Sequence, residues 1–412
     1  MSSISWYLIV ILFFLIGKYV LDTAVETANL RAMDPKLPEE FEGFYDGTEY
    51  ARSQRYTRDK TRLGLIQDTI GVFLVVPFIL LGGFNLLDTW ARGVGWGPIP
   101  TGLVYMFVLA VLAWFLGLPF KIYNIFYLEE RYGFNRMTVK TFILDTLKSL
   151  LLSILIGAPL LSVVLWFFET TGRLAPLYVW ILLTLFQLLM TFIAPVLIMP
   201  IFNKFTPLTE GDLRRKIDDY ADRQKFNMKG IFTMDGSRRS AKTNAFFTGF
   251  GRWRRIVFYD TLMEKHGEEE ILPILAHEMG HYKLGHILKM VVISLLENAF
   301  MLFLLSLFIN NRGLFDAFVM ENLSIYASLV FFGFLYSPVS TLVSVFTNWL
   351  SRRHERAADA FAVRTTSMGE SFVLALKKLS VDNLSNLTPH PWKVFLSYSH
   401  PPVLQRIRRI MR

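Results

Sequence analysis

The chain has 412 residues, of which 53% are hydrophobic, and its formal net charge at pH 7 is +9. Its mean hydropathy of +0.38 is too high for an ordinary soluble globular protein and indicates an integral membrane protein. The chain has no cysteine, which excludes disulfides and thiolate metal ligands, so a metal site would have to use His, Asp or Glu.

Apolar stretches long enough to cross a bilayer recur along the whole chain. About 20 apolar residues in a helix cross the ~30 Å hydrocarbon core. The first stretch lacks the basic start and the small-residue cleavage site of a secretory signal, so we expect it to be a retained anchor. The stretches predict seven transmembrane helices, numbered here as spans one to seven: 4–21, 69–87, 102–122, 149–168, 177–202, 287–309 and 325–350.

Basic residues alternate between the loops that join these spans. Residues 23–68 and 121–148 are rich in Lys and Arg, whereas Arg92, Arg173 and Arg312 lie in the three intervening short loops. The positive-inside rule then predicts an N-terminus outside and a C-terminus in the cytoplasm. The position of the basic residues in the cytoplasmic loops accounts for the positive net charge, and no nucleic-acid-binding motif accompanies it. We therefore expect the lipid bilayer as a partner and no nucleic acid.

Between spans five and six lies a polar stretch with signals for both helix and strand. A helix is expected over residues 207–226, and a β-hairpin over residues 242–250 and 253–259 with a Gly-Phe-Gly turn. The acidic residues Glu268 to Glu270 suit the first turn of another helix, which is expected to continue into span six. After span seven the tail is expected to be helical again, to residue 363 and over 372–379.

The predicted fold is therefore an all-α polytopic membrane protein with a small cytoplasmic α/β part. We divide it into an N-terminal membrane region of five transmembrane helices, residues 1–203, and a second region, residues 204–412, that holds the polar stretch, spans six and seven and the tail.

The strongest chemical signal is the segment His277-Glu278-Met279-Gly280-His281. Residues four apart share a helix face, so His277 and His281 can direct two imidazoles at one metal ion, and Glu278 can reach a water bound to it. This pattern is the zinc metallopeptidase signature, in which the ion activates water and the glutamate acts as general base.

A catalytic zinc ion needs a third protein ligand. The best candidate is Glu355 at the cytoplasmic end of span seven, because spans six and seven form an antiparallel pair that brings Glu355 to the histidines. Asp359, one helical turn later, can accept the free N–H of a ligand histidine. His354 is a rival ligand, but as the neighbour of Glu355 it points about 100° away, which favours a structural or surface role.

Three other histidines and one carboxyl inside a span need less specific explanations. His286 is five residues past His281 and is expected to lie off the ligand face in helix packing, and His266 and His390 are expected in loops. Glu297, a carboxyl inside span six, faces a cavity or a partner by default and is not expected to join the metal site.

Four blocks of the sequence occur together: Leu275 to His281, Glu355 to Asp359, Thr243 to Phe246, and His400-Pro401-Pro402 followed by Arg406-Ile407. With these blocks the sequence resembles the type I CAAX prenyl proteases, the seven-span zinc endopeptidases of the gluzincin group, over nearly its whole length, although Met279 stands where Leu is usual. The resemblance implies one Zn²⁺ per chain held by His277, His281 and Glu355, with Glu278 as general base and Asp359 as the partner of a ligand. It also implies transmembrane helices that enclose a large chamber with the zinc at its cytoplasmic end.

The last two blocks are expected to act on the substrate. Asn244, Ala245 and Phe246 lie in the first hairpin strand, whose edge can pair with an extended peptide, although plain hairpin packing explains them as well without the resemblance. His400 can donate to the oxyanion formed on the scissile carbonyl and Arg406 can orient it, a role that rests mainly on the resemblance.

The sequence thus predicts a zinc endopeptidase at the cytoplasmic membrane face, which is CAAX prenyl protease-like. The alternative is a transporter or channel with a structural metal site, for which Glu278 beside the ligands has no use. The expected substrate is a peptide or protein, prenylated or membrane-embedded, and no oligomer is required. Because the last residues are not an endoplasmic-reticulum retrieval signal, we expect a bacterial inner-membrane enzyme that serves in membrane-protein quality control. A eukaryotic source would place it in the endoplasmic reticulum membrane instead.

Overall fold

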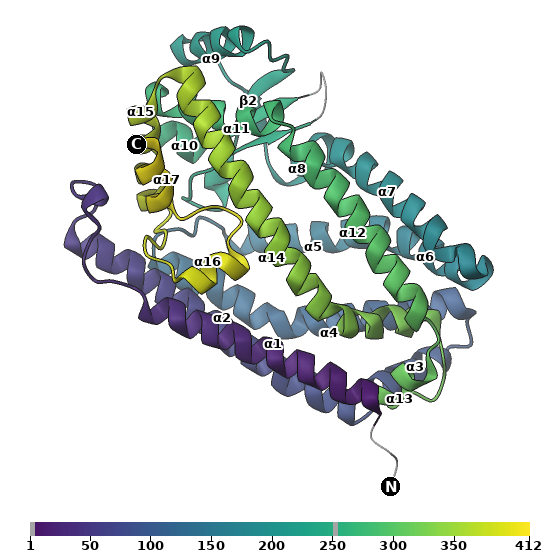
Figure 1. Cartoon of the computed structure of the whole chain (residues 1–412). Helices are drawn as coiled ribbons and strands as arrows, with labels where there is room; N and C mark the ends of the chain where they lie inside the picture. The colour runs from purple at the N-terminus through teal and green to yellow at the C-terminus, as the bar shows by residue number, and fades with distance from the viewer. Residues whose placement is uncertain (1–4, 250–253) are drawn as a thin grey trace.

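The computed structural model describes residues 5–249 and 254–412. Within these residues the chain forms long helices and one small sheet, with the sheet at the end of the molecule that also holds the C-terminus (Figure 1). The start of α1 (Trp6–Arg31) lies at the opposite end, near α3 (Gly83–Arg92) and α13 (Arg312–Ala317). The long helices therefore connect an end that holds the sheet with an end that holds the short helices α3 and α13.

The described residues contain seven helical segments that are long and apolar enough to cross a membrane, as the sequence predicted. Three segments include short π-helical turns, which join their α-helices without ending the segment. The seven are α1 (Trp6–Arg31); α2 (Gly47–Leu80); α4 (Pro98–Tyr123) with η2 (Asn124–Glu129); α5 (Val139–Leu152), η3 (Ser153–Gly157) and α6 (Ala158–Thr170); η4 (Gly172–Leu174), α7 (Ala175–Ile193), η5 (Ala194–Ile198) and α8 (Met199–Phe202); α12 (His286–Phe308); and α14 (Ile325–Thr366).

The predicted end of span two was wrong. Gly82 adopts a left-handed backbone with a φ of +71°, so α2 ends at Leu80 and the rest of the apolar run forms α3. A left-handed residue cannot continue an α-helix, and glycine adopts this conformation without steric cost. Residue 4, where span one was predicted to start, lies outside the described residues.

A second break interrupts the helix that was predicted to run unbroken through the histidine motif into span six. Gly285 has a φ of +69°, which ends α11 (Glu268–Lys283) and lets α12 start in a new direction at His286. The prediction of one continuous helix was therefore wrong. Because of the break, every side chain from His286 onward points in a different direction relative to the motif than it would on one continuous helix.

The small α/β part is built on four strands in the order β1-β2-β4-β3 among the described residues. β3 (Ala245–Thr248) pairs antiparallel with β4 (Arg255–Tyr259), which confirms the predicted strand pair, while residues 250–253 of its turn lie outside the described residues. β2 (Gly230–Met234) runs parallel to β4 and antiparallel to β1 (Phe205–Pro207). β3 is therefore an edge strand.

Shorter helices complete this part of the chain. The helix predicted over residues 207–226 is the shorter α9 (Asp212–Arg223), because β1 takes up its predicted start. α14 and α15 confirm the two helical regions predicted for the tail, each extending a few residues further. The remaining elements are η1 (Glu39–Phe41), η6 (Gly236–Arg238), α10 (Asp260–Lys265), α15 (Gly369–Asp382), α16 (Pro391–Ser397) and α17 (Val403–Ile410).

The apolar packing gathers into two clusters at the two ends of the long helices. One cluster joins the sheet, α11 and α15 to Tyr50, Tyr56 and Tyr132, and the other surrounds Phe84, Phe318 and Phe331 at the α3–α13 end. Between the clusters the spans bury few of their side chains. In the most apolar 18 residues of each span, at most 11% are buried inside the structure. A cavity of about 690 Å³ in this middle part is lined by α1, α2, α4 and α14.

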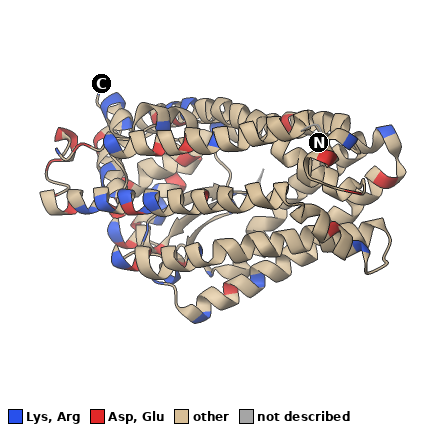
Figure 2. Cartoon of the chain, turned by 90° about the horizontal axis from the view of Figure 1, so that it is seen from below, with Lys and Arg blue, Asp and Glu red and all other residues tan. Residues whose placement is uncertain are grey.

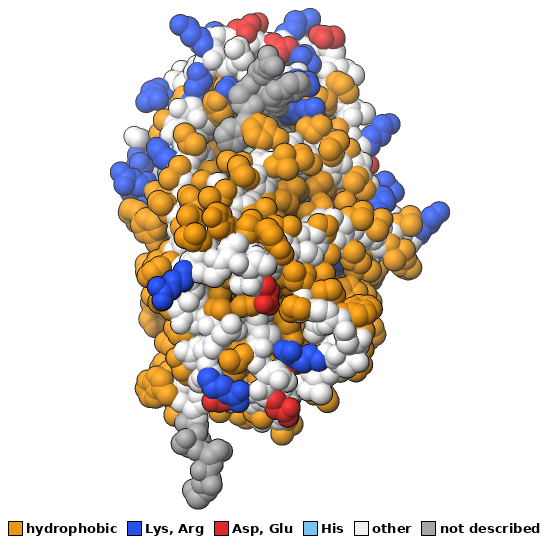
Figure 3. Space-filling view, turned by 90° about the vertical axis from the view of Figure 1, so that its right-hand side faces the viewer, with side chains coloured by type: hydrophobic (Ala, Val, Ile, Leu, Met, Phe, Trp, Pro, Cys, Tyr) orange, Lys and Arg blue, Asp and Glu red, His pale blue; other side chains and the backbone are white. Residues whose placement is uncertain are grey.

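The surface agrees with a membrane-embedded middle. Figure 2 shows Lys and Arg gathered mainly at the end that carries the C-terminus, with long uncharged stretches of helix beside it. Figure 3 shows a broad hydrophobic band between charged ends. The end with the sheet is therefore the aqueous, basic end, and the candidate site lies there.

Candidate metal centre

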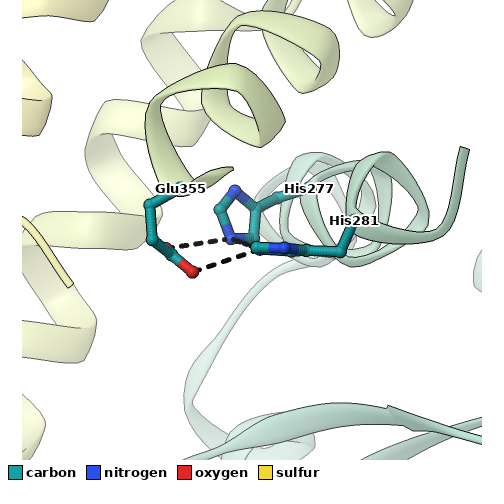
Figure 4. Close-up of side chains that lie close together, drawn as sticks. All are labelled: His277, His281 and Glu355. Atoms are coloured by element: carbon teal, nitrogen blue, oxygen red, sulfur yellow. Dashed lines mark hydrogen bonds and ion pairs between the residues drawn. The ribbon is translucent and has the colours of Figure 1, made fainter. Parts of the chain in front are cut away.

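Two packed helices supply the three predicted metal ligands. His277 and His281 lie one turn apart on α11, and Glu355 projects from α14 towards both imidazoles (Figure 4). The ligand atoms all lie within 4.8 Å of one another, and all three side chains are buried or half-buried. The structure thus brings Glu355 to two histidines that lie 74 and 78 residues before it in the chain.

The atomic distances leave room for one small cation between these groups. His277 Nε2 and His281 Nε2 lie 3.2 Å apart, and the Glu355 carboxylate oxygens lie 3.4 and 3.2 Å from them, respectively. Glu355 Oε2 is buried, and no described residue donates a hydrogen bond to it. A buried carboxylate oxygen without a donor is costly, and a metal ion would satisfy it. The donor set of two imidazoles and one carboxylate therefore fits a divalent cation.

Small residues allow the two helices to approach closely enough. A Cβ on Gly280 would lie 3.1 Å from the Phe361 ring and 3.3 Å from Ala358 Cα, closer than most real Cβ contacts. Met279, on the side of α11 away from solvent, is fully buried in the core. The residues between the two histidines therefore fix the position of α11 against α14.

A buried pair of charged residues, Asp359 and Arg406, orients His277 from the side away from Glu355. Asp359 accepts from His277 Nδ1 at 2.9 Å. Arg406 in turn donates to both oxygens of Asp359, from Nη2 at 2.6 Å and from Nε at 2.9 Å. Burial lowers the pKa of His277, but its contacts with the carboxylates of Asp359 and Glu355 outweigh it and raise the pKa to about 9. An ion that enters the site must therefore displace a proton from His277.

His286 is a site residue that the sequence did not predict. Its Nδ1 lies 3.2 Å from His281 Nδ1, and its ring stacks on His354 with centroids 4.0 Å apart and planes 9° apart. If His281 donates from Nδ1 to His286, its Nε2 keeps the lone pair that a metal ligand needs. Thus His286 orients His281, as Asp359 orients His277, and His354 holds His286 in place.

We expect His286→Ala to weaken divalent-metal binding by about 10–100-fold, the usual cost of losing such an orienting partner. Competition with a chelator of known affinity on the purified protein would measure this. Lys289→Ala is the matched control, because the exposed Lys289 lies one turn further along α12 and bonds only to the carbonyl of Leu284 among the described residues. An unchanged affinity in His286→Ala would rule out the orienting role.

The remaining predicted site residues surround this centre. His400 is largely exposed, with Nε2 3.3 Å from Glu355 Oε1 and Nδ1 2.9 Å from Ser399 Oγ. Arg406 pairs with Asp359, and its Nη1 also lies 3.9 Å from Glu355 Oε2, so it contacts the centre through both carboxylates. Asn244, Ala245 and Phe246 lead into and form the edge strand β3, which packs against α11. Glu278 is half-buried beside the ligands.

Comparison with known proteins agrees with this site and fold. Residues 26–204 match the model of the CAAX prenyl protease N-terminal region with five membrane helices, and residues 207–412 match the model of peptidase family M48. A CAAX prenyl protease 1 homolog of Oryza sativa subsp. japonica is 34% identical, with 97% of this chain and 96% of that protein covered. CAAX prenyl protease 1 of Saccharomyces cerevisiae is 32% identical, with 91% and 88% covered.

The three-dimensional comparison extends over the same length. The crystal structure of S. mikatae Ste24p superposes with a TM-score of 0.93 at 30% sequence identity, covering 98% of this chain and 99% of that one. The named relatives are proteases, which favours the protease interpretation and leaves the transporter alternative without support. The chain belongs to peptidase family M48, within its CAAX prenyl protease group, and is an integral-membrane metalloendopeptidase.

Proposed function

We propose that the chain hydrolyses peptide bonds with a single zinc ion held by His277, His281 and Glu355. The observation that supports this most is the buried carboxylate oxygen of Glu355 that faces the two imidazoles without a hydrogen-bond donor among the described residues. Two nitrogen donors and one carboxylate, with no thiolate, match the ligand sets of catalytic zinc sites, which keep one position open. His400 lies beside this ligand set, with its Nε2 3.3 Å from Glu355 Oε1.

When bound, zinc lowers the pKa of a water molecule towards neutrality and polarises the scissile carbonyl. Glu278 then takes the proton from the attacking water and returns it to the leaving amine. No hydrogen bond or ion pair occupies its carboxylate among the described residues, so both oxygens are available for this transfer.

Two further side chains act on the developing charge. His400 is exposed next to Glu355, and its Nε2–H can donate to an oxyanion that forms beside this ligand. Arg406 keeps Asp359 ionised and oriented towards His277, and it also forms an ion pair with Glu355 at 3.9 Å, so it supports two of the proposed ligands. Asp359 accepts from Nδ1 of His277 and thereby fixes the tautomer of this ligand.

The substrate is proposed to lie as an extended strand along the edge of β3. Asn244 is exposed at the start of this edge, and Ala245 and Phe246 follow in register with Phe258 and Val257 of β4. The relatives are named CAAX prenyl proteases, so we propose a prenylated C-terminal peptide as substrate, with turnover of other membrane peptides as the wider alternative.

The site is proposed to face the cytoplasm, with the N-terminus on the other side. The basic segments 23–68 and 121–148 pack through Tyr56 and Tyr132 into the same cluster as the sheet and α11, so the site shares their side of the membrane. The eukaryotic relatives favour the endoplasmic reticulum membrane over the bacterial inner membrane that the sequence suggested. The ranges matched by the two family models support a division of the chain near residue 204.

Three peptides and a chelator test this function on the purified protein. A prenylated CAAX peptide, its unprenylated twin and an unrelated peptide should all lose cleavage when zinc is removed and regain it when zinc is returned. The prenylated peptide should be cut at least about tenfold more efficiently, because each buried CH₂ of the prenyl chain contributes ~0.8 kcal/mol. Cleavage that survives metal removal would contradict the function, and equal cleavage of all three peptides would remove only the prenyl preference.

A further inference from the structure

A second cavity lies between α2 and the joined helices α4 and η2. It is lined by residues between 59 and 66 of α2 and between 119 and 131 of α4, η2 and the turn that follows, and we call it the α2–η2 groove. Its volume is about 540 Å³, within the range of roughly 300–1,000 Å³ that small-molecule sites occupy. None of its lining residues is a proposed metal ligand or belongs to β3. The groove is therefore a separate candidate binding site.

The α2–η2 groove opens on the outer side of α2. The inner side of this helix faces the sheet, because Lys60 pairs with Glu129, which pairs in turn with Lys242 just before β3. Arg62 of the groove follows Lys60 by two residues and therefore points about 200° away from it around the helix. One turn further, Ile66 is 53% exposed in the same lining. The groove therefore faces the surrounding bilayer.

The groove lies where two spans leave the membrane at the basic end of the molecule. The hydropathy pattern starts the apolar run of α2 at residue 69 and ends that of α4 at residue 122. The groove residues Arg62 and Ile66 come just before the first limit, and Tyr123 and Tyr127 just after the second. The two tyrosine rings stack with centroids 4.8 Å apart. Tyrosine is enriched at the depth of the lipid head groups, so the groove lies at that depth.

The rim of the groove carries an unbalanced positive charge. Its acidic side chain, Asp59, accepts from Tyr132 Oη at 2.7 Å and from Arg131 Nη1 at 3.3 Å. Arg62 is exposed and makes no ion pair or hydrogen bond with any described residue. Arg58, one turn earlier on the same side of α2, is exposed and equally unpaired within the described part of the chain. Like charges four residues apart destabilise a helix, so an anion beside the two arginines would be stabilising.

The rest of the lining is mostly apolar. Leu63 and Ile66 line the groove from α2, and Phe120 and Leu128 line it from α4 and η2. A free anion would leave these side chains uncovered, whereas an acyl chain would bury them. We propose that the α2–η2 groove binds an anionic phospholipid, with the head group at Arg62 and an acyl chain along these apolar residues. Basic pockets between transmembrane helices recognise anionic head groups in this way.

The groove is formed before a lipid enters it. Tyr132 packs edge-on against Tyr56 of α2 with ring centroids 4.9 Å apart, and Tyr56 Oη donates to Glu129 Oε1 at 2.7 Å. Together with the bond from Tyr132 to Asp59, these contacts tie α2 to η2 on the inner side of the groove. A preformed site does not have to order its own walls on binding, which lowers the cost of holding a lipid.

Native mass spectrometry of the purified full chain in a neutral detergent tests this site. The probes are phosphatidylglycerol and phosphatidylcholine with identical acyl chains, which share the phosphodiester and differ in the choline cation. The wild type should bind the first phosphatidylglycerol at least about fivefold more tightly, the contribution of one basic residue near an anionic head group. Arg62→Gln should remove most of this preference, and Arg62→Glu should reverse it. Because both lipids are compared on one sample, a loss of folded protein lowers both signals equally.

Arg409→Gln is the matched control, because it removes the same charge from an exposed position of α17, outside the groove and without an ion pair among the described residues. It should leave the preference unchanged. Equal binding of the two lipids by the wild type would overturn the proposal. An equal loss of preference in Arg409→Gln and Arg62→Gln would also overturn it, since the attraction would then belong to the whole basic end. Displacement of phosphatidylglycerol by an equal concentration of soluble glycerol phosphate would show an anion site without a lipid and would refute the proposal too.

Discussion

Glu278→Gln is expected to lower kcat for peptide cleavage by about 10²–10⁴-fold, the usual contribution of a general acid–base residue. Gln keeps the size of the side chain, but its amide cannot accept a proton from water at neutral pH. Glu278 is not one of the three ligands within 4.8 Å of one another, so the zinc content should stay at one ion per chain. The variant therefore separates the proton transfer from the metal.

The measurement pairs single-turnover cleavage of a peptide substrate with zinc analysis of the same protein sample. Glu269→Gln is the matched control, because it makes the same change at an exposed position in the first turn of α11 and should leave both quantities unchanged. If Glu278→Gln kept more than about a tenth of the wild-type rate, another group would have to be the base.

Hydropathy was sufficient to predict the transmembrane helices because a span is set by length and apolarity alone. It could not predict where helices end inside an apolar run. Gly82 and Gly285 both adopt left-handed backbone, and a single glycine within an apolar stretch does not reveal by itself whether it continues the helix or ends it. For Gly285 a signal was present, since Lys283 in the last turn followed by glycine is typical of a helix C-terminus.

The error at Gly285 also explains why His286 was missed. Counting residues around one unbroken helix places His286 away from the ligand face, whereas the start of α12 after the break returns its ring to His281. The ligands themselves were predictable because His277 and His281 are related by local helix spacing and Glu355 by a short helical hairpin.

The second large effect is expected for Glu355→Gln, which replaces the anionic ligand by a neutral amide of the same shape. We expect zinc affinity to fall by more than the ~10–100-fold anticipated for His286→Ala, because a direct ligand is altered instead of its orienting partner. Cleavage should fall together with zinc occupancy. The change also removes the carboxylate that helps to raise the pKa of His277.

Zinc occupancy across a chelator series, with the cleavage rate measured in the same samples, distinguishes this variant from Glu278→Gln. In Glu355→Gln both quantities should fall together, and excess zinc should restore part of each. In Glu278→Gln the zinc should stay bound while cleavage is lost. Glu370→Gln, an exposed position at the start of α15, controls for the loss of one negative charge. Full zinc binding in Glu355→Gln would show that Glu355 is not a ligand, and His354 or His400, both close to Glu355, would then be the next candidates.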